Sequence, residues 1–130
     1  MFIYDLSTYK KCTFVNITSQ VRDALKKSGV QNGFAIVYCP HTTAGIAINE
    51  NADPDVTADV LAAMEKIIPE VDFMHMEGNS PAHIKTVLTG SSATVPVSGG
   101  SLALGRWQGI YFCEYDGPRD RKFYVQITGE

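Results

Sequence analysis

The sequence predicts an α+β fold, with an antiparallel-rich, β-sandwich-like core and two or three helices. Short runs rich in β-branched and aromatic residues recur in both halves of the chain, and two proline-led segments with helical periodicity lie between them. The chain has 130 residues, of which 45% are hydrophobic and 19% are charged. We therefore expect a single domain over residues 1–130, because this length and composition can bury a core of ordinary size.

The N-terminal part is predicted to contain strands and one short helix. Phe2–Leu6 and Cys12–Ile17 are strand-like, and Phe34–Cys39 is a near-continuous apolar run, typical of a strand that is covered on both faces. Between them, Val21–Ser28 has apolar residues at helical spacing, and Gly29 follows as a natural helix stop.

Two further helices are predicted from their start signals. Asp53 followed by Pro54 is typical of a helix start, because aspartate caps free N–H groups and proline is tolerated at the first helical position. An apolar stripe follows and ends at Pro69. A shorter helix is expected from Ser80 to Gly90.

The C-terminal part is predicted to return to strands. Asp116-Gly117-Pro118 is a strong turn signal between the last two of them. The last strand alternates apolar and polar residues, as a half-buried antiparallel strand does. The strands expected here are Thr94–Val97, Leu102–Leu104, Gln108–Tyr115 and Lys122–Thr128.

Charge and cysteine usage exclude several classes of protein. The formal net charge is -3 and the basic residues are spread along the chain, which argues against a nucleic-acid partner. Cys12, Cys39 and Cys113 show no C-x-x-C spacing and are expected to be free, buried hydrophobes. Neither a signal-peptide pattern nor an apolar run of membrane-spanning length occurs, so we expect a cytoplasmic protein without a membrane partner.

The three histidines lie in polar, turn-flanked segments and not on apolar stripes. His41 follows the apolar strand, and His83 is expected with Lys85 in the first turn of the shorter helix, where the helix dipole favours neutral imidazole. Gly78 and Asn79 allow a turn that brings His75 back towards His83. We predict that the three histidines share one site. Their spacing matches no strong metal motif, so metal ligation by His41, His75 and His83 (Mg or Zn) and acid–base chemistry both stay open.

Carboxylates and hydrogen-bond donors add further candidates. Glu50 ends a short strand without an evident structural role, and either Glu50 or Asp59 could hold Mg²⁺. Glu114 shares a strand face with apolar residues, so it must be paired, metal-bound or at a rim. Donors suited to a phosphate group are Lys85, Ser91, Ser92, Arg106, Gln108 and Arg119.

Several motifs occur in one order along essentially the whole chain. They are His41-Thr42-Thr43-Ala44-Gly45, Asn49-Glu50-Asn51 with Asp53, Gly78-Asn79 ahead of His83-Ile84-Lys85, Gly90-Ser91-Ser92, Leu104–Ile110 and Asp116-Gly117-Pro118-Arg119. In this combination the sequence resembles the YjbQ family, whose members are also described as secondary thiamine-phosphate synthase enzymes. Arg106 departs from the family pattern, in which threonine is common before the Trp-Gln pair.

The resemblance implies a homotrimer whose subunits form a cleft that holds the three histidines, and a thiamine-phosphate synthase side activity. On this basis we expect an enzyme that acts on a phosphorylated small molecule. The expected catalytic residues are His41, Glu50, His83 and Lys85, and the expected substrate-binding residues are Asn79, Ser91, Ser92, Arg106, Gln108 and Arg119. The alternatives are a metal-dependent phosphate-ester hydrolase and a non-catalytic, trimeric module that binds a metal or ligand.

Overall fold

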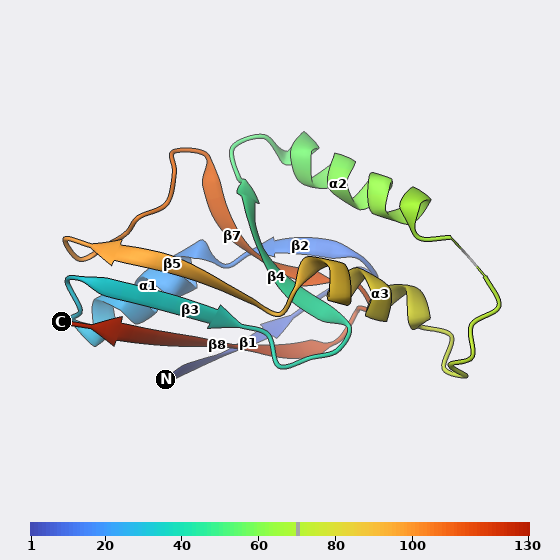
Figure 1. Cartoon of the computed structure of the whole chain (residues 1–130), viewed down its shortest axis with the longest axis horizontal. Coiled ribbons are helices and arrows are strands. Elements are labelled where there is room, and N and C mark those ends of the chain that lie inside the picture. The colour runs from blue at the N-terminus through green and yellow to red at the C-terminus, as the bar shows by residue number, and fades with distance from the viewer. Residues whose placement is uncertain (70) are drawn as a thin grey trace.

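The strands of the protein form two antiparallel sheets that curl into a half-barrel (Figure 1). The structure is a computed structural model that describes residues 1–69 and 71–130. The larger sheet contains, in spatial order, β1 (Phe2–Ser7), β8 (Asp120–Gly129), β3 (Gly33–Tyr38), β5 (Ser92–Ser98) and β6 (Ser101–Leu102). The smaller sheet contains β2 (Thr13–Asn16), β7 (Gln108–Glu114) and β4 (Ala44–Glu50).

The main core lies between the two sheets and α1 (Thr18–Ser28). In the larger sheet, Val37 of β3 lies opposite Val125 of β8, and both side chains are fully buried. Phe112 of β7 meets them from the smaller sheet, with its ring centroid 6.3 Å from that of Phe123. Buried residues alternate along β3, β5 and β8 of the larger sheet, as the period-2 pattern of a one-sided strand requires, whereas β7 is buried on both faces from Gly109 to Glu114.

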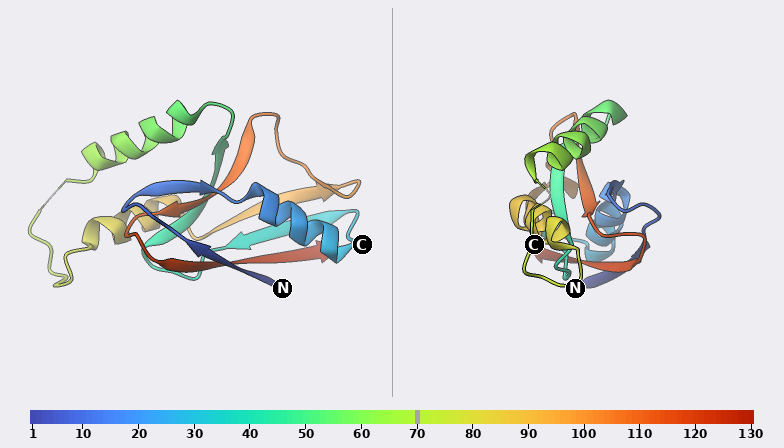
Figure 2. Two further views of the ribbon diagram at one scale, coloured as in Figure 1. Left: turned by 180° about the vertical axis from the view of Figure 1, so that it is seen from behind. Right: turned by 90° about the vertical axis from the view of Figure 1, so that its right-hand side faces the viewer.

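Most helix ends coincide with the expected signals, although α1 begins at Thr18, three residues before the expected Val21. Gly29 adopts a left-handed conformation at the end of α1, with φ of 72°. Asp53 caps α2 (Pro54–Ile67), because its carboxylate accepts a hydrogen bond of 2.9 Å from the Asp55 N–H. Along its length, α2 lies outside the sheets (Figure 2) and none of its residues is buried. No helix among the described residues is both long and apolar enough to cross a membrane.

The third helix, α3 (Ser80–Thr89), positions two of the candidate residues. The Asn79 carbonyl accepts the first helical hydrogen bonds, from the N–H groups of Ala82 and His83, so Ser80 already occupies the first helical position. His83 therefore lies in the first turn, as expected. The expectation for Lys85 is wrong, because it is the sixth helical residue and lies in the second turn.

Candidate functional site

A polar cleft of about 410 Å³ is formed where four separate segments meet. These segments are the loop after β3, the 75–79 segment, the first turn of α3 and the connection between β7 and β8. All three histidines line this cleft, which we call the histidine cleft. Its lining residues are Pro40, His41, Thr42, Thr43, His75, Glu77, Asn79, His83, Arg119 and Arg121.

His41 is held against the edge of the larger sheet. Its Nε2 lies 2.9 Å from the backbone nitrogen of Lys122, from which it can accept a hydrogen bond, and 3.1 Å from the Lys122 carbonyl oxygen, to which the other tautomer can donate one. Burial lowers the pKa of His41, and the positive charge of Arg121 lowers it further. His41 is therefore neutral near pH 7, and the tautomer that accepts at Nε2 carries its proton on Nδ1.

His75 and His83 form a pair on the opposite side of the cleft. Their ring centroids are 5.4 Å apart, and the rings meet edge to face at 85°. The Nε2 atom of His75 lies 3.8 Å from a carboxylate oxygen of Glu77, whose side chain is largely exposed. The turn at Gly78, where φ is 79°, brings these residues back towards α3, as the sequence predicts.

Asn79 connects this pair to the turn between β7 and β8. Its side-chain Nδ2 donates a hydrogen bond of 3.0 Å to Oδ2 of Asp116. The same carboxylate oxygen accepts a bond of 3.0 Å from Nη2 of Arg119, whose guanidinium is half-exposed. Asp116 thus aligns an amide and a guanidinium group, and Arg119 remains accessible to a ligand at the mouth of the cleft.

A buried ion pair between Arg121 and Glu114 forms the base of the cleft. Arg121 Nε donates to Glu114 Oε1 at 2.8 Å, and its Nη2 donates to the Thr43 hydroxyl at 2.8 Å. The Glu114 side chain is completely buried and also accepts bonds from the Thr8 hydroxyl at 2.7 Å and the Asp116 N–H at 3.0 Å. This confirms the expectation that Glu114 must be paired.

Glu114 is ionised in the folded protein. Burial alone would raise the pKa of its carboxyl, but the hydrogen bonds from Arg121, the Asp116 N–H and Thr8 outweigh burial and lower it. Glu114 and Arg121 therefore form an ion pair that adds no net charge at the base of the cleft. Because Thr8, Thr43 and the Asp116 N–H, from three segments of the chain, bond to this pair, it fixes the loop that carries His41.

Lys85 lies outside the histidine cleft, in a neighbouring cavity of about 290 Å³. The two cavities share Glu77 and Asn79 in their linings. The Lys85 ammonium is almost fully buried, forms an ion pair with Glu65 of α2, and lies 3.8 Å from the Sγ of Cys12. Lys85 can therefore act only on a ligand that extends from the cleft past Asn79.

The other predicted site residues lie elsewhere in the chain. Glu50 and Gln108 face each other at the far end of β4, which is 7 residues long, so they are about 20 Å from its beginning near His41. Arg106 stacks on the ring of Trp107 at 4.9 Å, beyond the same end. The Ser91-Ser92 segment starts β5 and does not line the cleft.

A metal site is not preformed in the described part of the chain. No three His, Cys, Asp or Glu side chains within residues 1–69 and 71–130 are grouped so that they could hold a metal ion. The three imidazoles share a cleft, but the Nε2 of His41 is engaged by the Lys122 backbone. Asp59, considered with Glu50 for Mg²⁺, is exposed on α2. The present arrangement of donors suits an anion better than a cation.

The pairing of Arg121 with Glu114 and its bond to Thr43 were not predicted from the sequence, where Arg121 was only one of the cations that could bind an anion. A signal for Arg121 was available, because it is in phase with Phe123 and Val125 on the buried face of β8. A cation on the buried face of a strand requires a buried anion beside it. Glu114, a carboxylate on an apolar strand face, was already a candidate for that anion. Thr43 carried no comparable signal.

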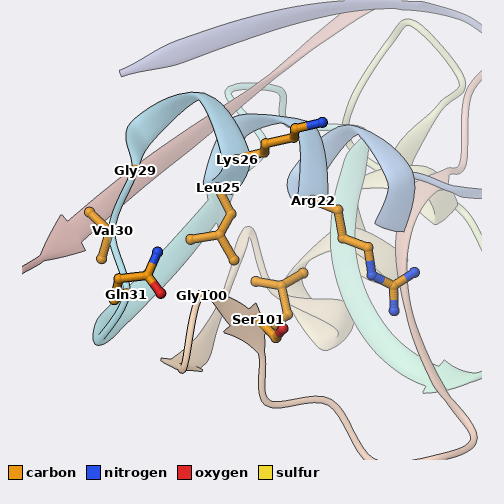
Figure 3. Close-up of a pocket in the computed structure, with 9 residues that line it drawn as sticks. Arg22, Leu25, Lys26, Gly29, Val30, Gln31, Gly100 and Ser101 are labelled. Atoms are coloured by element: carbon orange, nitrogen blue, oxygen red, sulfur yellow. The ribbon is translucent and has the colours of Figure 1, made fainter.

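A second cavity, of about 460 Å³, lies beside the C-terminal end of α1 (Figure 3). It contains none of the predicted site residues. Arg22 and Lys26 border it, but Figure 3 shows their charged groups pointing in different directions. Leu25 and Val30 supply much of its wall. Because its polar groups do not converge, this cavity is a weaker candidate than the histidine cleft.

Comparison with known proteins shows a family-wide likeness. The sequence profile of the family described as "UPF0047 protein YjbQ-like" matches residues 3–130. The UPF0047 protein YugU of Bacillus subtilis is 50% identical over 127 residues, which cover 95% of this chain and 96% of that protein. A UPF0047 protein of Methanocaldococcus jannaschii is 49% identical, with 100% of this chain and 95% of the relative covered.

Solved structures show the same likeness. The crystal structure of an uncharacterized YjbQ/UPF0047 protein from Clostridium acetobutylicum superposes with a TM-score of 0.97 at 54% identity, covering 98% of this chain and 100% of the other. A protein of unknown function from Sulfolobus solfataricus gives a TM-score of 0.95 at 33% identity, covering 99% and 96% of the two chains. These relatives share the fold and carry no stated activity.

Proposed function

The chain belongs to the YjbQ-like UPF0047 family, and from its histidine cleft we propose that it is an enzyme acting on a phosphorylated small molecule. One observation carries the proposal: His41, His75, His83 and Arg119, which come from four different segments, line a single polar cleft. Structural side chains need not converge in this way. Convergent imidazole and guanidinium groups are the usual means of holding a phosphate and moving a proton beside it.

Each residue has a role in this proposal. Arg119, half-exposed and aligned by Asp116, binds phosphate oxygens at the mouth of the cleft. His41, kept neutral by burial, donates a hydrogen bond to the same group. His83, in the first turn of α3, is the proton-transfer residue, because its imidazole lines the cleft beside the His75 ring and can accept or donate a proton there.

As a side reaction we propose thiamine-phosphate formation, which joins a pyrimidine-methyl diphosphate to a thiazole phosphate and expels pyrophosphate. Charge builds up on the departing diphosphate in the transition state, so cations aimed at it lower the barrier. Arg119 supplies one such cation, and Lys85 supplies another if the substrate reaches past Asn79 into the neighbouring cavity. A divalent metal, when bound, would neutralise the same charge, but no step here depends on it.

We also propose that the protein works as a cytoplasmic homotrimer. Three apolar side chains of α3 are exposed in the single chain, namely Ile84, Val87 and Leu88, and a subunit contact would cover them. Cysteines that remain free are normal in a reducing compartment. Light scattering after size-exclusion chromatography tests the assembly, and a monomer at micromolar concentration would contradict it.

The first test is the binding of pyrophosphate, measured by isothermal titration calorimetry. We expect Arg119→Gln to weaken binding about tenfold, because a hydrogen bond to a charged group contributes about 1.5 kcal/mol or more. His83→Ala should abolish pyrophosphate release from the two thiamine precursors. Arg106→Gln is the matched control, since Arg106 lies outside the cleft and its loss should leave binding unchanged.

The alternatives give different results in the same experiments. A phosphate-ester hydrolase would release phosphate from a simple phosphate monoester when a divalent metal is added, and would lose this activity in His83→Ala. A non-catalytic module would bind pyrophosphate with the same dependence on Arg119 and turn over neither substrate. Equal losses in Arg106→Gln and Arg119→Gln would contradict the assignment of the cleft itself.

A further inference from the structure

A small, mostly apolar cavity of about 160 Å³ lies beneath α2. Residues of α2 form one side of it, and residues of β2 and β4 form the other. The apolar residues that line it are Val56, Val60 and Met64 from α2, and Phe14, Ala47 and Ile48 from the sheet.

The helix above this cavity is less well packed than its apolar stripe would allow. None of the residues of α2 is buried, whereas α1 buries Val21, Ala24 and Leu25 in the core. Among the side chains of α2, Leu61 and Met64 pack partly against the small core cluster that contains Tyr111 and Tyr115, and Glu65 pairs with Lys85. The apolar walls of the cavity therefore lack contacts that an apolar occupant would supply.

The volume of the cavity limits the size of a ligand that can bind in it. An enclosed apolar protein cavity of about 150 Å³ is large enough to take up benzene, and the space beneath α2 is similar in volume but partly open to solvent. At about 160 Å³ the space beneath α2 fits one six-membered ring and little more. Two aromatic residues already border it: the rings of Phe14 and Tyr115 meet edge to face at 74°, with centroids 6.3 Å apart.

The cavity also has one polar point, at the hydroxyl groups of Tyr115 and Thr89. These oxygens are 2.6 Å apart, so one hydroxyl donates to the other. Burial raises the pKa of Tyr115, so its phenol keeps its proton. This bond uses only one of the two hydroxyl hydrogens. The other acceptor available to the Tyr115 hydroxyl is the thioether of Met64, at 3.7 Å. A thioether is a weak acceptor, which a ligand nitrogen or oxygen would replace.

From the volume, the apolar walls and the hydroxyl pair, we propose that the cavity beneath α2 binds a small aromatic ring carrying one hydrogen-bond acceptor. The site is independent of the proposed phosphate chemistry, because its lining shares no residue with that of the histidine cleft. Ring binding and pyrophosphate binding can therefore succeed or fail separately.

Two probes of equal size test the proposal, namely pyridine and benzene at pH 8. Binding is followed by NMR of the methyl groups of Ala47, Val60 and Met64, with the fully exposed methyl of Met74 as an internal control. We expect saturable shifts at the three cavity methyls and none at Met74. Tyr115→Phe should weaken pyridine binding about tenfold and leave benzene binding unchanged, because only pyridine loses a hydrogen bond.

Filling the cavity should remove binding of both probes. Ala47→Leu places a larger side chain in the space, and Val60→Leu does so from the helix side if the first variant does not fold. Both variants should keep the pyrophosphate affinity of the parent protein. The proposal is overturned if the cavity methyls show no saturable shift, or if both folded filling variants bind the probes as well as the parent. It is equally overturned if these methyls shift only with protein concentration, since a second copy would then cover the site.

Discussion

The two walls of the histidine cleft differ in how they are held. On the His41 side, Arg121 and Glu114 form a buried pair, and Thr43 bonds directly to the guanidinium group. On the other side, His75 and Glu77 are exposed, and the His75 Nε2 lies 3.8 Å from the Glu77 carboxylate. The first wall has a fixed geometry before any ligand arrives, whereas the second is free to adjust to one.

This difference follows from where each wall sits in the chain. His41 is next to β3, in the centre of the larger sheet, and its ring contacts the backbone of the neighbouring β8. His75 belongs to a connection between two helices that has few buried side chains. The rigidity of each histidine is therefore determined by the element that carries it, a paired strand for His41 and an exposed connection for His75.

The largest effect is expected from removing the buried anion. Glu114→Ala leaves the Arg121 guanidinium buried without a partner, and the free energy of unfolding should fall by about 3–5 kcal/mol. Urea unfolding followed by circular dichroism measures this change. Glu77→Ala is the control on the other wall and should change stability by less than about 0.5 kcal/mol. Similar losses in both variants would mean that the walls are held equally.

A smaller loss of stability is expected at Thr43. Thr43→Val keeps the shape of the side chain but removes the hydroxyl that accepts from Arg121 at 2.8 Å. Because the buried guanidinium then loses one acceptor, the free energy of unfolding should fall by about 1–3 kcal/mol. Thr42→Val, at the exposed neighbouring residue, is the matched control. If Thr43→Val is as stable as the parent, the bond between Thr43 and Arg121 does not fix the loop.

The His41 wall should also respond to pH. Its folded-state pKa lies below the ordinary 6.5, so the unfolded chain binds the proton more readily. The stabilising contribution is therefore complete above pH 6.5 and is lost as the pH falls through the folded-state pKa. The lowered pKa of Glu114 acts in a separate window, below its ordinary value of 4.5.

Unfolding free energies between pH 5.5 and pH 7.5 isolate the contribution of His41. His41→Gln should flatten the decrease in stability on the acid side, and His75→Ala should not. A parent protein whose stability is constant across this window, or rises towards acid, would refute burial of a neutral His41.

The sequence was sufficient to predict the parts of the fold that repeat a simple pattern. The capped start of α2 at Asp53 and the alternating apolar residues of β8 are local signals, and both are confirmed. Of β4 only the end was expected, because its run Ala44–Glu50 mixes small and polar residues and has no clear alternation. β6 is shorter than Leu102–Leu104 suggested, since only Ser101–Leu102 pair with β5.

Site residues could be predicted only where the sequence around them is distinctive. The three histidines stand in polar, turn-flanked segments, and all three line one cleft. Glu50 and Gln108 also stood in polar motifs, but position along a strand decides what they can reach, and they lie at the far end of β4. The bond between Thr43 and Arg121, which are 78 residues apart, could not be predicted, because the sequence near either residue does not indicate its partner.

The smallest effect on stability is expected at His75, where the comparison is sharpest. His75→Ala removes a side chain that contacts the edge of the His83 ring and, at 3.8 Å, the Glu77 carboxylate. The free energy of unfolding should therefore change by less than about 0.5 kcal/mol. Pyrophosphate binding should nevertheless weaken, because one donor at the cleft is lost. Calorimetric titration beside urea unfolding measures both quantities on one sample.

Met76→Ala, at an exposed neighbour outside the lining, should change neither quantity. A loss of stability at His75 comparable to that of Thr43→Val would show that the second wall is also fixed in advance, and the distinction between the walls would fail.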